Sequence, residues 1–353
     1  MNVSVLVTAA GGIVAQGIIK SLKLATASKN IPVEYRIVAT DMSNQATGIY
    51  RCNSGILVPS ATSSNYVDSL IKVCNEQNIL AIYVGSDKEM LVIGNAKDRI
   101  ESETDAKVIT NPLNVLNIAR DKWKTCEFLK SANLPYAAYS LPENSEKFIQ
   151  EFGFPLVIKP REGYGSLHFY VVNDRDEMAY AISKIQNIGW HPLLQEYLKG
   201  DNTEFTSGVT VDRFGEYIMS SITIRKIIKN GQTYKAFIDD FENIRRSAEE
   251  VALKIGARGP INIQAKLGND IPKIFEINPR FSATCPMRSA AGINEPDIMF
   301  RNLVLNEDIK MKEYKRLVCL RYWNEIYVPF VTFEETLYNG RVDDNDSYRL
   351  DYF

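Results

Sequence analysis

Two oxygen-bearing side chains on one short apolar stretch have the clearest chemical potential in this sequence. Glu276 and Asn278 alternate with apolar residues, so on a strand both side chains project from the same face. Oxygen donors placed in this way suit a hard divalent cation. Gln264 lies on an expected preceding strand, 261–267, which can return through a turn near 268–270. The pattern predicts that Gln264, Glu276 and Asn278 converge on a metal site.

Arg280 follows this stretch and offers a second explanation for the carboxylate. A buried carboxylate is costly without a partner, and Arg280 could form a purely structural salt bridge with Glu276. The residue types alone leave both explanations open.

A lysine and a glycine-rich loop lie side by side further towards the N-terminus. Residues 155–160 form an apolar strand that ends with Lys159, and the loop at 162–166 contains Gly163 and Gly165. A lysine at a strand end can hold a phosphate while the N–H groups of a flexible loop close over it. The alternative is an ordinary β-turn.

The stretch 193–198 is an apolar strand that ends in polar residues, and Glu204 follows shortly after it. Exposed backbone at such an edge can pair with an adenine, and the carboxylate of Glu204 can accept hydrogen bonds from ribose hydroxyls. The alternative is a plain strand followed by an acidic loop.

The elements that must position these residues fall into two kinds. The first 110 residues alternate strands with amphipathic helices, which predicts a parallel sheet covered by helices. Beyond a turn at 111–112, several strands show the period-2 alternation of antiparallel sheets. The fold class is therefore α/β followed by α+β.

Composition and charge narrow the class of protein. The 353 residues are 45% hydrophobic and carry a net charge of −2 without a long run of one sign, so nucleic acid is not an expected partner. The apolar start lacks a basic n-region, and no stretch reaches the length of a membrane span, so a cytoplasmic protein without membrane contact is expected. Five scattered cysteines predict neither zinc nor disulfides.

The order of these motifs resembles the ATP-grasp superfamily, most closely the grasp module of carbamoyl-phosphate synthase large chains. The resemblance covers about residues 1–300. It implies a Rossmann-like pre-grasp domain at 1–112 and a two-lobed nucleotide-binding region at 113–305. The lid lobe would span about 125–195 and the C-terminal lobe about 196–305, with a C-terminal extension at 306–353.

The resemblance also implies roles for individual residues. The γ-phosphate and acyl phosphate would face Arg280, and Arg225 would meet the substrate carboxylate, with an exposed strand arginine as the alternative. Magnesium, as two ions for which Mn²⁺ can substitute, would be held by Gln264, Glu276 and Asn278. The nucleotide would contact Lys122, Lys159, the lid residues Gly163, Gly165 and Ser166, the hinge residues Gln195, Glu196 and Leu198, and the ribose carboxylate Glu204.

Two departures from the family pattern concern the metal and the acceptor. Gln264 stands where many ATP-grasp enzymes have a carboxylate, and Ala283, Thr284 and Cys285 stand where glycines are frequent. Acceptor identity is therefore not readable from the chain.

The implied activity is that of an ATP-dependent carboxylate–amine ligase, which forms an amide-type bond through an acyl phosphate on a small amino acid or sugar acid. The rival is a non-catalytic ATP-binding sensor or scaffold. An NAD-dependent oxidoreductase is disfavoured because the loop at 8–12 lacks a complete Gly-x-Gly-x-x-Gly pattern. The expected partners are small-molecule carboxylates and amines. The aromatic residues of 310–353 predict core packing or a homodimer interface.

Overall fold

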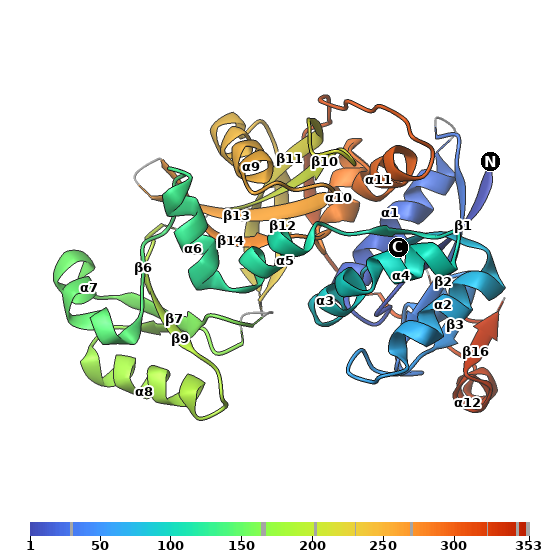
Figure 1. Cartoon of the computed structure of the whole chain (residues 1–353), viewed down its shortest axis with the longest axis horizontal. Coiled ribbons are helices and arrows are strands. Elements are labelled where there is room, and N and C mark those ends of the chain that lie inside the picture. The colour runs from blue at the N-terminus through green and yellow to red at the C-terminus, as the bar shows by residue number, and fades with distance from the viewer. Residues whose placement is uncertain are drawn as a thin grey trace.

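The computed structural model describes residues 1–28, 31–163, 167–200, 203–229, 231–268, 271–322, 324–343 and 346–350. The chain forms three sheets, each with its own helices (Figure 1). The predicted combination of an α/β region with an α+β region is confirmed.

The N-terminal sheet has the order β16-β3-β2-β1-β4-β5, and all pairs are parallel except β16 with β3. This is the arrangement expected of a doubly wound domain, in which ligands gather at the carboxyl ends of the strands. Its strands are β1 Asn2–Val7, β2 Glu34–Asp41, β3 Ser54–Leu57, β4 Ile79–Tyr83, β5 Lys107–Ile109 and β16 Arg341–Asp343. Its helices are α1 Ile13–Ala27, η1 Ile49–Arg51, α2 Tyr66–Gln77, α3 Asp87–Asn95 and α4 Lys97–Glu103.

A small antiparallel sheet with the order β6-β9-β7-β8 forms a separate lobe, at the lower left of Figure 1. Its own core packs the sheet against α7 and α8. The elements are β6 Tyr139–Ser140, η2 Pro142–Asn144, α7 Ser145–Phe152, β7 Leu156–Pro160, β8 Tyr170–Val172, α8 Arg175–Gln186 and β9 Pro192–Glu196.

The third sheet, β14-β13-β10-β11-β12-β15, is antiparallel throughout. One face packs on α9 and on the helix pair α5 and α6, and the other shares a core with α1, α10 and α11. Its strands are β10 Glu204–Val211, β11 Ile218–Lys229, β12 Gln232–Ile238, β13 Pro260–Gly268, β14 Ile271–Asn278 and β15 Leu317–Leu320. The helices are α5 Leu113–Arg120, α6 Lys122–Ser131, α9 Glu242–Lys254, α10 Cys285–Ala291, α11 Glu295–Leu303 and, further on, α12 Phe330–Asn339.

The C-terminal segment adds one strand to the third sheet and one to the N-terminal sheet. β15 extends the third sheet at β12, and β16 extends the N-terminal sheet at β3, where α12 and β16 lie together in Figure 1. Both strands come from the segment 306–353, and their partners, β3 and β12, lie far apart in sequence.

Candidate active site

A cavity of about 650 Å³ lies between the two antiparallel sheets and helices α1 and α3 of the N-terminal domain, and most of the predicted site residues line it. Those that reach it are Lys122, Lys159, Gly163, Gln195, Leu198, Glu204, Gln264, Glu276, Asn278 and Arg280. They come from segments between 122 and 280, so long-range strand pairing is what assembles them.

Lys159 lies buried at the end of β7, surrounded by neutral acceptors. Its Nζ donates to Gln195 Oε1 at 2.5 Å, to Tyr139 Oη at 3.2 Å and to the Phe275 carbonyl oxygen at 3.5 Å. Burial, and then the neighbouring Lys122, lower the pKa of Lys159 to about 7. An anion brought into the cavity would favour the charged form of this lysine.

Lys122 begins α6 and reaches back to the loop that follows β7. Its Nζ donates to the carbonyl oxygen of Gly163 at 3.1 Å. Asp121 caps α6 by accepting from the backbone of Trp123, and it also pairs with Arg161 at 2.6 Å. The start of α6 is thereby tied to the lid lobe, which keeps two lysines from different elements at one end of the cavity.

A row of polar side chains crosses the third sheet at the cavity. Strand register places Gln264 of β13 opposite Glu276 of β14, and β13 pairs with β10 on its other side. Lys226 Nζ pairs with Glu204 at 2.8 Å and donates to Gln264 Oε1, while Gln264 Nε2 donates to Glu276. Each of the four therefore has a partner within the row.

Arg280 links this row to the N-terminal domain. Its Nε and Nη2 donate to Asp87 at 2.6 and 2.8 Å, and Nη2 also donates to Asn278 Oδ1 at 3.2 Å. Burial lowers the pKa of Arg280, but the Asp87 carboxylate outweighs burial, so the pKa is raised. Arg280 therefore forms its salt bridge with Asp87, at the start of α3, and not with Glu276.

The donor set fits a hard cation that brings further oxygen ligands of its own. Among the described residues, no three His, Cys, Asp or Glu side chains gather, because two of the three candidates are amides. Glu276 and Asn278 present oxygens on one strand face at the cavity, which suits Mg²⁺, since it commonly takes one or two protein oxygens together with phosphate oxygens. All three candidates already accept a hydrogen bond within the protein: Gln264 from Lys226, Glu276 from Gln264 and Asn278 from Arg280.

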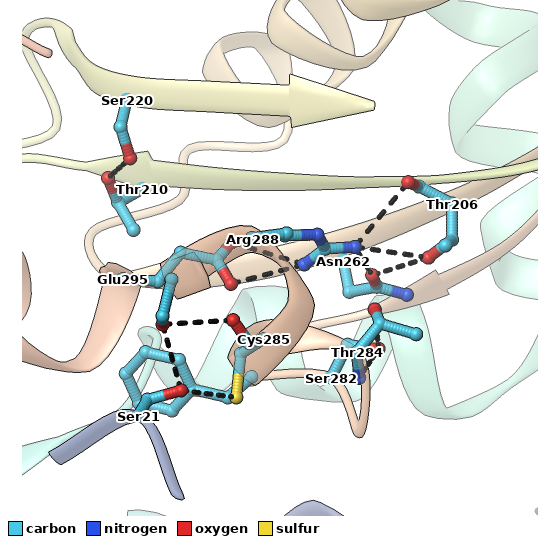
Figure 2. Close-up of polar contacts among 12 residues, drawn as sticks. Ser21, Thr206, Thr210, Ser220, Asn262, Ser282, Thr284, Cys285, Arg288 and Glu295 are labelled. Atoms are coloured by element: carbon cyan, nitrogen blue, oxygen red, sulfur yellow. Dashed lines mark hydrogen bonds and ion pairs between the residues drawn. The ribbon is translucent and has the colours of Figure 1, made fainter. Parts of the chain in front are cut away.

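A buried ion pair supports the wall of the cavity behind the row (Figure 2). Arg288 lies 3.2 Å from both carboxylate oxygens of Glu295 and donates to Asn262 Oδ1 at 2.8 Å. Thr206 donates to the same oxygen at 2.7 Å, so Asn262, which lines the cavity, is held in place. Gly208 makes room for the pair, because a Cβ there would lie 1.9 Å from Glu295 Oε1.

Two predicted residues point elsewhere, for a reason that strand alternation explains. Arg225 stacks on Phe237, with the guanidinium carbon 4.1 Å from the ring centroid, and it lies opposite the core residue Phe205. The cation that reaches the cavity is the next residue, Lys226. The expectation that Arg225 meets the substrate carboxylate is therefore corrected, since its side chain lies on the other face of the sheet.

Glu196 does not line the cavity. Its carboxylate pairs with Lys273 at 2.6 Å and accepts from the Ala138 backbone at 2.8 Å, which ties β9 to β14. The hinge positions that line the cavity are Gln195, Tyr197 and Leu198. Gly165 and Ser166 lie outside the described residues.

Sequence reasoning missed three further residues at the cavity. Lys226 directly follows Arg225, the residue predicted from the sequence, and only the register of β11 decides which of the two faces the cavity. Asp87 pairs with Arg280 across more than 190 positions of sequence, and no local pattern predicts that pairing. Arg321, also on the cavity wall, follows β15 in the C-terminal segment and belongs to no motif.

Comparison with known proteins agrees with this architecture. Residues 119–284 match the ATP-grasp domain, and residues 6–109 match the PylC-like N-terminal domain. The carbamoyl phosphate synthase large chain of Helicobacter pylori (strain J99) is 24% identical over 264 residues, which is 69% of this chain and 24% of that protein. The carbamoyl-phosphate synthase of Methanobrevibacter smithii is 23% identical over 244 residues, 65% of each chain. This chain thus spans about a quarter of the length of the Helicobacter relative.

Solved structures share the fold. The N5-carboxyaminoimidazole synthetase of Staphylococcus aureus complexed with ADP has a TM-score of 0.69 at 14% identity, covering 96% of this chain and 85% of that one. The biotin carboxylase complex of Campylobacter jejuni has a TM-score of 0.66 at 18% identity, with coverages of 84% and 70%.

The chain has the fold of ATP-grasp proteins. It carries an ATP-grasp domain at 119–284, preceded by a PylC-like N-terminal domain at 6–109, and the resemblance predicted from the sequence is confirmed. The predicted enzyme class, ATP-grasp ligase, agrees with these relatives and neighbours. No helix of the described residues is long and apolar enough to cross a bilayer.

Proposed function

We propose that this protein is an ATP-dependent carboxylate–amine ligase that forms an amide-type C–N bond through an acyl phosphate. The observation that carries the proposal is the convergence of two lysines, an arginine and a carboxylate–amide pair on one cavity. Lys122 and Lys159 offer positive charge to phosphates, Glu276 and Asn278 offer oxygens to a metal, and Arg280 lies beside them. The domain matches add support, because both belong to the architecture of ATP-grasp proteins.

The nucleotide end of the cavity follows from the same residues. An adenine would lie against the hinge formed by Tyr197 and Leu198, and Glu204 would accept from ribose hydroxyls. Two Mg²⁺ ions held by Glu276 and Asn278, with Gln264 nearby, would supply charge neutralisation for the phosphates. Gly163, whose carbonyl Lys122 contacts, begins the predicted lid loop.

The reaction then requires two displacements. A substrate carboxylate oxygen attacks the γ-phosphorus of ATP, the bond to the β-phosphate oxygen breaks, and ADP leaves with that electron pair. The resulting acyl phosphate has a carbonyl carbon that an amine attacks, and inorganic phosphate leaves as the amine loses a proton to water. Arg280 would stabilise the transferring phosphoryl group and the acyl phosphate, and Lys159 would hold the phosphate chain.

The test is release of ADP and phosphate with Mg·ATP across a panel of amino acids and sugar acids. Each compound is assayed with and without hydroxylamine, which traps an acyl phosphate as a hydroxamate. Release that depends on one carboxylate and yields its hydroxamate is the expected result. Carboxylate-dependent ATP hydrolysis without a hydroxamate would reject the acyl-phosphate route.

The rival function is a nucleotide-binding sensor or scaffold that ligates nothing. The retained oxygen donors at Glu276 and Asn278 favour the enzyme, because a protein that only binds nucleotide has no need of them for phosphoryl transfer. Tight ATP binding with no turnover on any carboxylate–amine pair would favour the sensor.

A further inference from the structure

A cation from the C-terminal segment lies on the cavity wall. Arg321 lines the cavity and donates to two carbonyl oxygens, those of Thr233 and Ala283, each at 2.9 Å. No carboxylate pairs with Arg321 in the part of the chain that the structure describes. Ile13, at the start of α1, also lines the cavity.

Helix α1 and η1 carry further cations, which lie outside the residues that line the cavity. Gln16, Lys20 and Lys23 follow one another at helical spacing, so they share one face of α1. Arg51, which ends η1, donates from Nη1 to Gln16 Oε1 at 2.6 Å and so lies against the same face. Within the described ranges, none of these three cations forms an ion pair with a carboxylate.

Close packing of Gly17 and Ser21, on a neighbouring face of α1, fixes the helix relative to the segment that Arg321 contacts. A Cβ on Gly17 would lie 3.4 Å from the Cα atom of Ala283, whose carbonyl oxygen accepts from Arg321. Figure 2 shows Ser21 of α1 beside Cys285, with Ser21 Oγ 3.5 Å from Cys285 Sγ. Helix α1 therefore cannot move away from the segment before α10 without breaking these contacts.

The cations repel one another. Burial lowers the pKa of Lys20, and Arg51 and Arg321 lower it further. Burial also lowers the pKa of Lys23, with Arg51 and Arg349 contributing in the same direction. A chain with 43 acidic and 41 basic residues has enough carboxylates to neutralise such a group, yet none is supplied from the described residues.

We propose that Arg321 forms a subsite for an anionic group, a phosphate or a second carboxylate, on the non-nucleotide substrate, and that Lys20, Arg51 and Lys23, which lie outside the cavity lining, add longer-range attraction for that group. The inference rests on the proposed ligase function and narrows its substrate class. One end of the substrate would react beside Arg280, and its anionic end would lie against Arg321. The wall between them is formed by Ser282, Ala283 and Thr284.

The test measures anion binding without turnover. The full chain is saturated with Mg²⁺ and a non-hydrolysable ATP analogue, which occupies the nucleotide phosphate positions, and is titrated calorimetrically with methyl phosphate and, separately, succinate. One charge-assisted contact contributes about 1.5–3 kcal/mol, so Arg321→Gln should raise the Kd of the preferred probe about tenfold or more, and Lys20→Gln, which removes a charge outside the cavity lining, should raise it less. The stronger probe distinguishes a phosphate site from a carboxylate site.

Three controls keep the result interpretable. Lys72→Gln, on an exposed lysine of α2 that pairs with Glu76, should leave probe binding unchanged. Arg321→Lys should recover part of the affinity, because it keeps the charge. Unchanged affinity for the ATP analogue in Arg321→Gln shows that the variant is folded.

Two outcomes would overturn the subsite. One is wild-type protein that binds neither probe, whether at low salt or at 1 M ionic strength. The other is equal probe binding by wild type, Arg321→Gln and Lys20→Gln. Because the titration needs no ligation, anion binding without any hydroxamate would remove the ligase proposal alone.

Discussion

The two ends of the cavity differ in how their charges are balanced. Where the polar row crosses β10, β11, β13 and β14, Lys226 pairs with Glu204, and Arg280, which follows β14, pairs with Asp87. At the other end, Arg321 donates only to backbone carbonyl oxygens among the described residues. Lys226 and Arg280 are therefore balanced by carboxylates of the protein, whereas Arg321 is left without one among the described residues.

This difference separates two tasks that a ligase must combine. Phosphoryl transfer requires preorganised groups, and paired side chains hold their positions before the substrates arrive. Selection of an acceptor requires groups whose interactions become favourable only when the correct ligand is bound. The internally paired end suits the first task, and the cation-rich end suits the second.

The largest effect is expected from removing the carboxylate of the paired end. Glu276→Ala should lower kcat for ADP release by about 10² to 10³, because one charge-stabilising group in phosphoryl transfer contributes that much. Arg280→Ala should lower it to a similar degree. Steady-state assays of both variants check this, with Glu242→Ala on the remote helix α9 as the control. Turnover within about tenfold of wild type in both variants would contradict the assignment of this end to phosphoryl transfer.

A smaller effect separates two adjacent residues on β11. Lys226→Met leaves Glu204 without its cation at the cavity, so the KM for ATP should rise about tenfold, the size expected when one charge-assisted contact is lost. Arg225→Met removes only a stacking contact with Phe237 on the opposite face and should leave that KM nearly unchanged. Equal effects of the two variants would mean that the side of the sheet does not matter for nucleotide binding.

The sequence predicted the sheet types and part of the site because alternation is a local property. Glu276 and Asn278 share a face for a reason visible in five consecutive residues, and both line the cavity. The choice between Arg225 and Lys226 depends on how β11 aligns with β10, which no local pattern states. Strand alternation alone would allow either Arg225 or Lys226 to face the cavity.

Arg321 illustrates a different limit. It reaches the cavity because β15 pairs with β12, more than 75 positions earlier in the chain, and because its guanidinium donates to Ala283. No motif surrounds it, and the resemblance to the ATP-grasp superfamily ends near residue 300. Only the pairing of distant strands could place it beside α1.

Proton uptake on nucleotide binding should be measurable at the paired end, where Lys159 has neutral hydrogen-bond partners. Because the pKa of Lys159 is lowered to about 7, most of this lysine is neutral at pH 8 in the free protein. Phosphates nearby raise that pKa, so binding of ATP at pH 8 should take up close to one proton, whereas at pH 6 the lysine is already charged and uptake should nearly vanish. Calorimetry in buffers of different ionisation enthalpy measures this number. Lys159→Met should abolish the uptake, and persistence of uptake in that variant would assign the proton to another group.

The smallest effect concerns thermal stability at the cation-rich end. Lys23→Gln removes one of several like charges, so without ligand Tm should rise slightly, by less than about 2 °C, since a surface charge interaction is worth at most about 1 kcal/mol. The rise should disappear at about 1 M NaCl, where the Debye length is near 3 Å. Lys72→Gln, which loses an exposed partner in Glu76, should show no rise at either salt concentration. Thermal unfolding of the three proteins at low and high salt makes the comparison. A lower Tm for Lys23→Gln at low salt would mean that this lysine already has an anionic partner within the protein, and the contrast between the two ends of the cavity would no longer hold.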